Sequence, residues 1–263
     1  MQRRIAPNGV VYYASPLFES RGVPHGFSTR LGGVSPAPFD SLNLGNPNGC
    51  EIQDDYERVW QNYRLLQAAA CCAPNAELCH VHQVHGSAVV TVRAGESFDN
   101  SRKADAIVGS DPSRVLSVRV ADCVPVLLAS DDGRTVAAVH AGWRGVIAGV
   151  VPAALGQMGG EADSVVAAIG PCIGAEAFEV GSEVLDEFAG AFGAAAPVRN
   201  RGGGKGMVDL REAVRLQLIG AGVRAARIDV SDRCSYRDAE EFFSHRRDRG
   251  ITGRMAAIIA PAA

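Results

Sequence analysis

Two runs of apolar residues constrain the fold of this chain more than any other feature. One run covers residues 115–129 and the other covers residues 135–139. Asp131, Asp132 and Gly133 lie between them, and such a cluster between apolar runs is typical of a tight hairpin turn. The pattern therefore predicts two buried strands joined by a turn.

The remaining elements follow from hydrophobic spacing and from glycine and proline positions. Helices are predicted over residues 54–70, 144–158, 183–192 and 209–218, with Asp209 as the cap of the last. Strands are predicted over residues 80–92 (one strand or a pair around Gly86), 165–169, 227–230 and 254–259. A strand end and a loop are expected over residues 27–35 and 41–45, and a mobile loop is expected over residues 199–206. Strands and helices mix without regular alternation, which predicts one α+β domain over residues 1–263 with a mixed or antiparallel sheet.

Charge and composition exclude several classes of protein. The chain has 26 basic and 29 acidic residues. It therefore lacks the excess of basic residues that would favour a nucleic acid or an anionic membrane as partner. Aromatic residues make up only 6% of the chain, which argues against an aromatic surface on which the bases of a single-stranded nucleic acid would stack. No run of about 18 apolar residues occurs, so no membrane span is expected.

Cysteine usage and the first residues predict a cytoplasmic protein. The chain has seven cysteines, an odd number at irregular spacing that does not suit a disulfide framework. No apolar segment follows the charged first residues, so no export signal is expected. Reduced thiols in the cytoplasm are then the default.

Two residues with chemically capable side chains follow the predicted strands. Cys123 comes after the apolar stretch 116–120, and His140 comes after 135–139. Asp122 and Pro125 are poor residues for the middle of a strand, so regular pairing is expected to break beside the thiol. The small residues after His140 let a ligand approach the backbone closely. A thiol and an imidazole at the ends of two buried strands can meet at one point.

A third metal ligand is available among His80, His82 and His85. On a strand, His80 and His82 share one face and His85 lies on the other. Spacing leaves the choice open, and His85 is favoured because Gly86 behind it opens space. Histidine, cysteine and histidine form a set that binds zinc and leaves a fourth position free.

Other interpretations of these residues remain open. Cys123 could act as the nucleophile of a hydrolase with His140 as its base. Each residue could also be an ordinary buried side chain, or part of a protein that binds a metal or nucleoside without catalysis. The C-terminal stretch 232–254 is dense in arginine and hydroxyl groups, which suits phosphate or ribose recognition as well as a solvated loop.

The ordered motifs resemble those of the bacterial YfiH-type family, which also carries the labels laccase domain and polyphenol oxidase. The motifs that carry the resemblance are Phe27–Ser35, Ser41–Gly45, Gln83–Gly86, Ala121–Val126, His140–Gly145, Ile169–Pro171, Phe178–Val180, Asp232–Cys234 and Phe243–Arg247. They run through nearly the whole chain. The resemblance implies a layered α+β sandwich with mixed sheets flanked by helices, in two subdomains, similar to cytotoxic necrotising factor.

The same resemblance implies a ligand set and an activity. It implies that the zinc ligands of this chain are His85, Cys123 and His140. It implies purine nucleosides and phosphate as substrates, with phosphorolysis of adenosine, inosine and S-methyl-5'-thioadenosine and deamination of adenosine. One departure concerns the first long helix, where the family often has Asn-Arg and this chain has Asn62, Tyr63 and Arg64. Whether Arg64 reaches the substrate is therefore open.

The laccase label can be tested against the histidine count. A four-copper oxidase needs roughly ten histidine ligands, because imidazole is the ligand that suits copper. This chain has six histidines, so a multicopper cluster does not fit. Copper in place of zinc at the same three residues, with a polyphenol oxidase activity, is one alternative. A Cys–His amidase active in peptidoglycan editing is another.

Roles for further residues follow from the chemistry that the resemblance implies. An open zinc position suits deamination because bound zinc increases the acidity of water, and Asp122 is the candidate for moving protons. Arg30 and Arg246 are predicted to bind phosphate. Asn43 and Gln83 are predicted to make polar contacts with the nucleoside.

Overall fold

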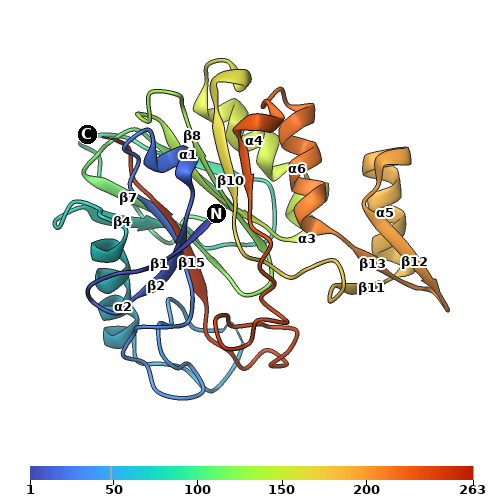
Figure 1. The fold of residues 1–263 in the computed structure, drawn as a ribbon, viewed down its shortest axis with the longest axis horizontal. Helices are drawn as coiled ribbons and strands as arrows, with labels where there is room; N and C mark the ends of the chain where they lie inside the picture. The colour runs from blue at the N-terminus through green and yellow to red at the C-terminus, as the bar shows by residue number, and fades with distance from the viewer. Residues whose placement is uncertain (48, 263) are drawn as a thin grey trace.

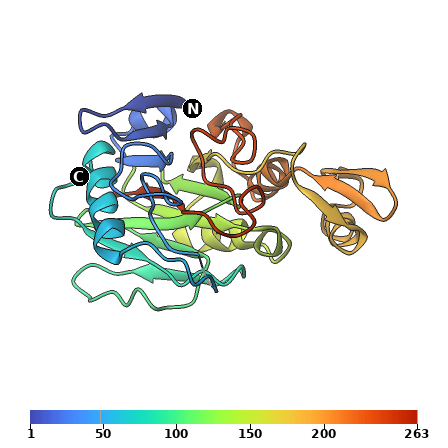
Figure 2. The same ribbon diagram turned by 90° about the horizontal axis from the view of Figure 1, so that it is seen from below.

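The computed structural model describes residues 1–47 and 49–262. In this part of the chain, two six-stranded sheets pack face to face, with helices on their outer faces (Figures 1 and 2). The first sheet has the order β1 (Gln2–Ile5), β2 (Val11–Ala14), β3 (His25–Ser28), β15 (Met255–Ile259), β7 (Arg114–Val120) and β4 (Glu77–His80). Strands from both ends of the chain therefore meet in one sheet.

The second sheet contains the predicted hairpin. Its order is β14 (Ile228–Val230), β10 (Val166–Ile169), β8 (Val124–Ala129), β9 (Val136–Ala141), β6 (Ala106–Gly109) and β5 (Val89–Val92). Strands β8 and β9 pair in antiparallel register, and the Ser130 amide donates to the Thr135 carbonyl at 2.9 Å. The turn through Asp131, Asp132 and Gly133 is confirmed.

The main core lies between the two sheets and follows the two-residue repeat of strands. Leu116 of β7 and Ala257 of β15 meet Leu127 of β8 and Ala138 of β9 in one fully buried cluster. Val126, next to Leu127, instead joins the cluster under the helices. Alternate residues of β8 thus fill two different cores, which is why this run is apolar throughout.

Helices cover both outer faces. Helix α2 (Tyr56–Ala69) packs Val59, Tyr63 and Leu66 on the first sheet, and the short α1 (Pro16–Glu19) precedes β3. Helices α3 (Trp143–Ile147), α4 (Val150–Met158) and α6 (Leu210–Gly220) cover the second sheet. The predicted helix over residues 144–158 is thus two helices, because Gly149 adopts a φ of 77° between them.

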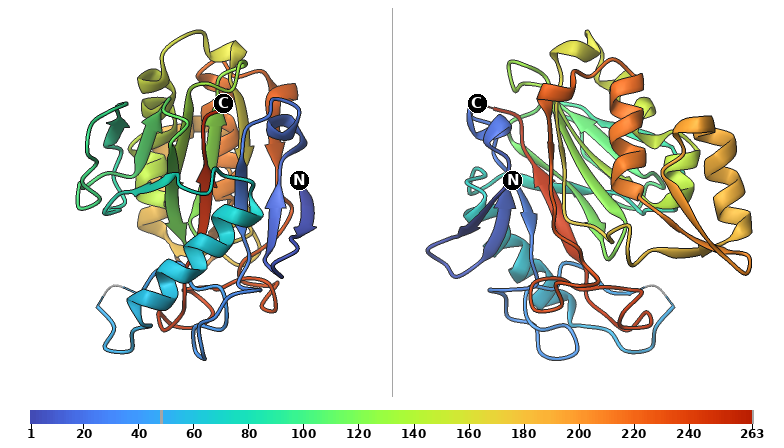
Figure 3. Two further views of the ribbon diagram at one scale, coloured as in Figure 1. Left: turned by 90° about the vertical axis from the view of Figure 1, so that its left-hand side faces the viewer. Right: turned by 45° about the vertical axis from the view of Figure 1, so that its right-hand side comes forward.

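A smaller unit extends from one end of the sandwich (Figure 3). It contains β11 (Glu179–Gly181), α5 (Ser182–Phe192), β12 (Val198–Gly202) and β13 (Lys205–Val208), and its three strands form an antiparallel sheet. The prediction of a mobile loop over residues 199–206 is wrong, since these residues form the β12–β13 hairpin. Three short 3₁₀ turns complete the described elements: η1 (Ala162–Ser164), η2 (Gly193–Ala195) and η3 (Ala225–Arg227).

The α+β class with mixed sheets is confirmed. Most strand pairs are antiparallel, but β4 with β7, β5 with β6, and β10 with β14 run parallel. The predicted strand or strand pair over residues 80–92 is only partly correct, since β4 ends at His80, β5 begins at Val89, and the segment 81–88 between them is irregular. No described helix has the length and apolar character that crossing a membrane requires.

Candidate metal centre and its cavity

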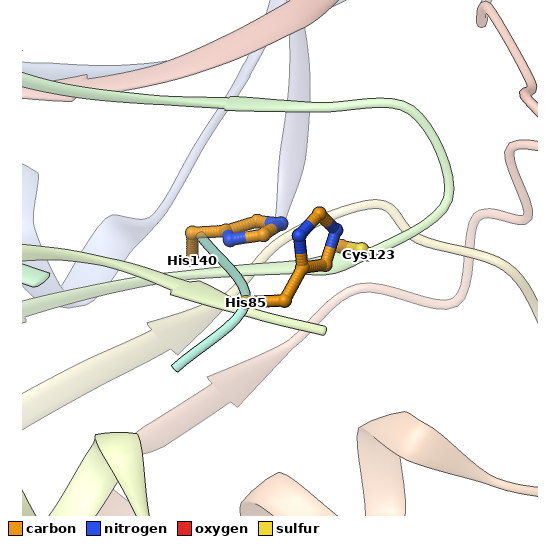
Figure 4. Close-up of side chains that lie close together, drawn as sticks. All are labelled: His85, Cys123 and His140. Atoms are coloured by element: carbon orange, nitrogen blue, oxygen red, sulfur yellow. The ribbon is translucent and has the colours of Figure 1, made fainter. Parts of the chain in front are cut away.

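His85, Cys123 and His140 come together from three segments of the chain (Figure 4). One potential ligand atom of each lies within 4.8 Å of the others. The two imidazole rings meet edge to face, with 4.8 Å between their centroids. This spacing allows one ion to contact all three residues after small side-chain rotations.

Strand register explains why these residues converge. In the β8–β9 hairpin, Pro125 lies opposite His140, so Cys123, just before β8, is at the same end of the sheet. Strand β6 pairs with β9 and places Ala106 opposite Val139. Strand β5 runs parallel to β6, which brings the segment that precedes it, including His85, to this end as well.

Asp105, at the start of β6, joins the two histidine segments. Its side chain is fully buried. One carboxylate oxygen lies 2.8 Å from Nδ1 of His140, and the carboxylate also accepts from the amides of Val84, His85 and Gly86. The sequence interpretation missed Asp105, although a single aspartate before an apolar strand was a visible signal.

The surroundings favour the charged forms of the thiol and of the imidazole of His140. Burial opposes ionisation of Cys123, yet His140 and His85 lower the pKa of its thiol to about 6. Burial likewise opposes protonation of His140, but Cys123 and Asp105 raise its pKa to about 9. The thiolate is the form of cysteine that binds metals and acts as a nucleophile.

The three residues line a cavity of about 360 Å³. Arg119, Arg246 and Arg254 line it as well, and within the described part of the chain none of them forms an ion pair with a carboxylate. Unpaired guanidinium groups in a concave site attract anions. The cavity wall also includes His82, His245, Ile173 and Phe178.

Besides the three potential ligands, three other predicted site residues line this cavity, and each is held by other parts of the protein. Both amide atoms of Gln83 bond to the backbone of Arg119, at 2.7 and 2.8 Å. The carboxylate of Asp122 accepts from the Ser235 hydroxyl at 2.6 Å and from the Arg246 amide at 2.7 Å. The guanidinium of Arg246 donates to the carbonyl of Glu179 at 2.8 Å.

Arg30, Asn43 and Arg64 do not line the cavity. The guanidinium of Arg30 donates to the Asp40 carbonyl and lies over the ring of Phe243. Asn43 is buried, and its Oδ1 accepts from the Arg254 amide at 2.9 Å. Arg64 is on the exposed side of α2. Of the two predicted phosphate-binding arginines, Arg246 lines the cavity and Arg30 does not; Arg119 and Arg254 also line it but were not singled out from the sequence, because they fall at strand ends.

Comparison with known proteins finds relatives that cover most of the chain. "Purine nucleoside phosphorylase YfiH" of Escherichia coli (strain K12) is 39% identical over 92% of this chain and 95% of its own length. "Purine nucleoside phosphorylase PA4543" of Pseudomonas aeruginosa is 39% identical over 88% of this chain and 90% of its own length. The crystal structure of YlmD from Geobacillus stearothermophilus superimposes with a TM-score of 0.86 at 31% identity, covering 99% of both chains.

The family assignment rests on these relatives and on a match over residues 24–262 to the family described as "Multi-copper polyphenol oxidoreductase laccase". The resemblance to YfiH-type proteins is confirmed. This chain therefore belongs to the multi-copper polyphenol oxidoreductase laccase family, whose members include the YfiH-type proteins.

Proposed function

We propose that this protein is a zinc-dependent purine nucleoside phosphorylase that accepts adenosine, inosine and S-methyl-5'-thioadenosine and also deaminates adenosine. The names of its relatives support the phosphorylase activity. The observation that carries the proposal is a single cavity that combines a His–Cys–His group with unpaired arginines. A phosphorylase must hold phosphate beside a nucleoside, and the arginines of this cavity can bind the phosphate.

The donor set fits zinc better than a copper cluster. Two imidazole nitrogens and a thiolate leave one tetrahedral position open for a reactant. Among the described residues, no second group of three or more potential ligands occurs, whereas a multicopper site needs several. When bound, zinc supplies a Lewis acid that increases the acidity of water.

We assign phosphate binding to Arg246 and, in place of Arg30, which lies outside the cavity, to Arg119 and Arg254. Guanidinium groups offer paired donors that match phosphate oxygens. Ile173 and Phe178 give the same cavity an apolar wall, which suits a purine ring. Asp122 is the candidate proton-transfer group, and its bonds to Ser235 and Arg246 fix its orientation.

The test measures metal content and turnover on one protein preparation. Elemental analysis should find one zinc per chain. Each nucleoside should release free base only when phosphate is present, and adenosine should yield some inosine without phosphate. Cys123→Ala should lose the metal and both activities in a single-turnover assay. Full retention of both activities in that variant would contradict a metal-centred mechanism.

A second candidate function is a Cys–His hydrolase, as a peptidoglycan-editing amidase would require. It is favoured by the sequence of contacts from Asp105 through His140 to Cys123 and by the low pKa of the thiol, an arrangement that activates nucleophiles. Alkylation with iodoacetamide distinguishes the two. A nucleophilic thiol reacts in the protein as purified, whereas a zinc-bound thiolate reacts only after chelation.

A further inference from the structure

We infer that Asp105 is the positioning residue of the metal centre: it selects the nitrogen that His140 offers and holds the segment that carries His85. This inference rests on the proposed metal site. Its basis is that a single buried carboxylate contacts both histidine segments. No contact between Asp105 and a substrate is needed.

The contact with His140 determines the orientation of its ring. Oδ1 of Asp105 lies 2.8 Å from Nδ1 of His140, so a proton on Nδ1 points at the carboxylate. The backbone adds a second bond, from the His140 amide to the Asp105 carbonyl at 2.8 Å. Nε2 is then the ring nitrogen left for a metal. Metal-binding histidines commonly donate their other N–H to a carboxylate in this way.

The contact with the His85 segment determines its backbone. The carboxylate accepts from three successive amides, those of Val84 at 3.2 Å, His85 at 2.9 Å and Gly86 at 2.7 Å. His85 has a φ of 60°, which residues other than glycine rarely adopt. These three bonds to one carboxylate hold the backbone conformation of His85. They thereby also determine the direction in which its imidazole points.

The burial of Asp105 has no other explanation in the described part of the chain. Its carboxylate is fully buried, and among the described residues no lysine or arginine forms an ion pair with it. A buried carboxylate is costly unless hydrogen bonds compensate its lost hydration. Here the compensating donors are the ring of His140 and the amides around His85. The hydrogen bonds of this aspartate therefore position the two histidines.

The test replaces the carboxylate with an amide of the same size. Oδ1 of Asp105 contacts the His140 ring and the His85 amide, and Oδ2 accepts from the amides of Val84 and Gly86. In Asp105→Asn, the NH₂ group replaces one of these oxygens, so one of the two sets of bonds is lost. We expect zinc affinity, measured by competition with a chromophoric chelator, to fall about 10- to 100-fold. Asp111→Asn is the control, because Asp111 also accepts from a loop amide, but its side chain contacts Ser113 and Arg114 and neither histidine segment. The zinc affinity of this variant should not change.

A second measurement needs no variant. In the zinc-loaded wild-type protein, long-range ¹H–¹⁵N spectra should show His140 protonated at Nδ1 and bound through Nε2. Metal on Nδ1, or an Asp105→Asn variant with wild-type affinity, would overturn the role of Asp105 while leaving the metal site in place. A wild-type protein without affinity for zinc or Co²⁺ would overturn both the metal site and this inference.

Discussion

At the scale of single residues, space beside the metal centre matters as much as charge. A Cβ atom on Gly142 would lie 2.9 Å from Cδ2 of His85 and 3.1 Å from Sγ of Cys123. The φ of Gly142 is −71°, which any residue tolerates. The glycine is therefore required by the two neighbouring side chains and not by its own backbone.

We predict that Gly142→Ala lowers zinc affinity about tenfold or more, the range seen when a group that positions metal ligands is changed, while the protein remains folded. The measurement is chelator competition together with thermal unfolding. Gly156→Ala in α4 is the matched control, since nothing lies within 4 Å of its added methyl group. That change should leave zinc affinity unaltered and stabilise the helix by up to about 1 kcal/mol. If Gly142→Ala kept the zinc affinity of the wild type, the site would be shown to accommodate the added methyl group without displacing His85 or Cys123.

The arginines of the cavity make a separate residue-scale prediction. Hydrogen bonds to charged groups contribute about 1.5–3 kcal/mol each, so Arg119→Gln should raise the KM for phosphate about 10- to 100-fold. The KM for the nucleoside should change much less. Arg64→Gln is the control, because Arg64 is exposed on α2 and lies outside the cavity. Steady-state kinetics with phosphate as the varied substrate test both variants; a phosphate effect in Arg64→Gln alone would reverse the assignment.

His80 predicts how stability depends on pH. Burial, with a contribution from Arg119, lowers the pKa of its imidazole to about 4, and its Nδ1 has no hydrogen-bond partner among the described residues. In the unfolded chain the pKa is about 6.5. Between these values the unfolded state binds a proton that the folded state does not, so stability falls as the pH is lowered from about 6.5 to 4.

The expected loss from His80 is up to about 3 kcal/mol over that interval, at about 1.4 kcal/mol for each pH unit. Urea unfolding at a series of pH values measures it. In His80→Gln this part of the pH dependence should disappear, so lowering the pH from about 6.5 to 4 should destabilise the wild type more than the variant. Parallel curves for wild type and variant would mean that His80 is not the group responsible.

At the scale of elements, apolar spacing and capping residues predicted the helices. They missed a strand that forms only because it pairs with another segment. Helix α2 and the cap of α6 follow from apolar spacing and from an aspartate at each start. Strand β12 contains Arg199 and Arg201 and has no apolar face. It is a strand because β13 pairs with it, and pairing between segments leaves no trace in local composition.

The candidate site shows the same division. Cys123 and His140 were visible because each interrupts or ends an apolar run. Spacing left the choice among His80, His82 and His85 open; Gly86 favoured His85, and the family resemblance then selected the full triad. The role of Asp105 was missed, since it depends on the register of β6 with β9. Arg254 was noted only as part of the arginine-rich stretch 232–254, since its place in the cavity depends on the fold.

The start of α6 gives the element-scale prediction. The Asp209 carboxylate accepts from the Glu212 amide at 3.0 Å, which satisfies one of the free donors of the first turn. We predict that Asp209→Ala lowers the free energy of unfolding by about 1 kcal/mol, as chemical denaturation can measure. Asp209→Asn, which keeps the acceptor oxygen, should cost clearly less. Equal losses in both variants would point to charge and not to capping.

At the scale of the whole molecule, the core between the two sheets connects distant parts of the chain. It contains Phe27 near one end, Leu127 in the middle and Ile259 near the other end. Such a shared core does not form unless both sheets are present. We therefore expect residues 1–263 to unfold as one cooperative unit and not as two independent subdomains.

Leu127→Ala tests this expectation, because Leu127 is fully buried on the face of β8 that meets the first sheet. Removing its side chain should cost about 2–5 kcal/mol. The transitions seen by far-ultraviolet circular dichroism and by tryptophan fluorescence should move together, since Trp60 lies on α2 beside the first sheet and Trp143 on α3 beside the second. Ile219→Ala on the exposed side of α6 should change little. Two separated transitions, of which only one responds to Leu127→Ala, would show that each sheet with its helices is a folding unit of its own.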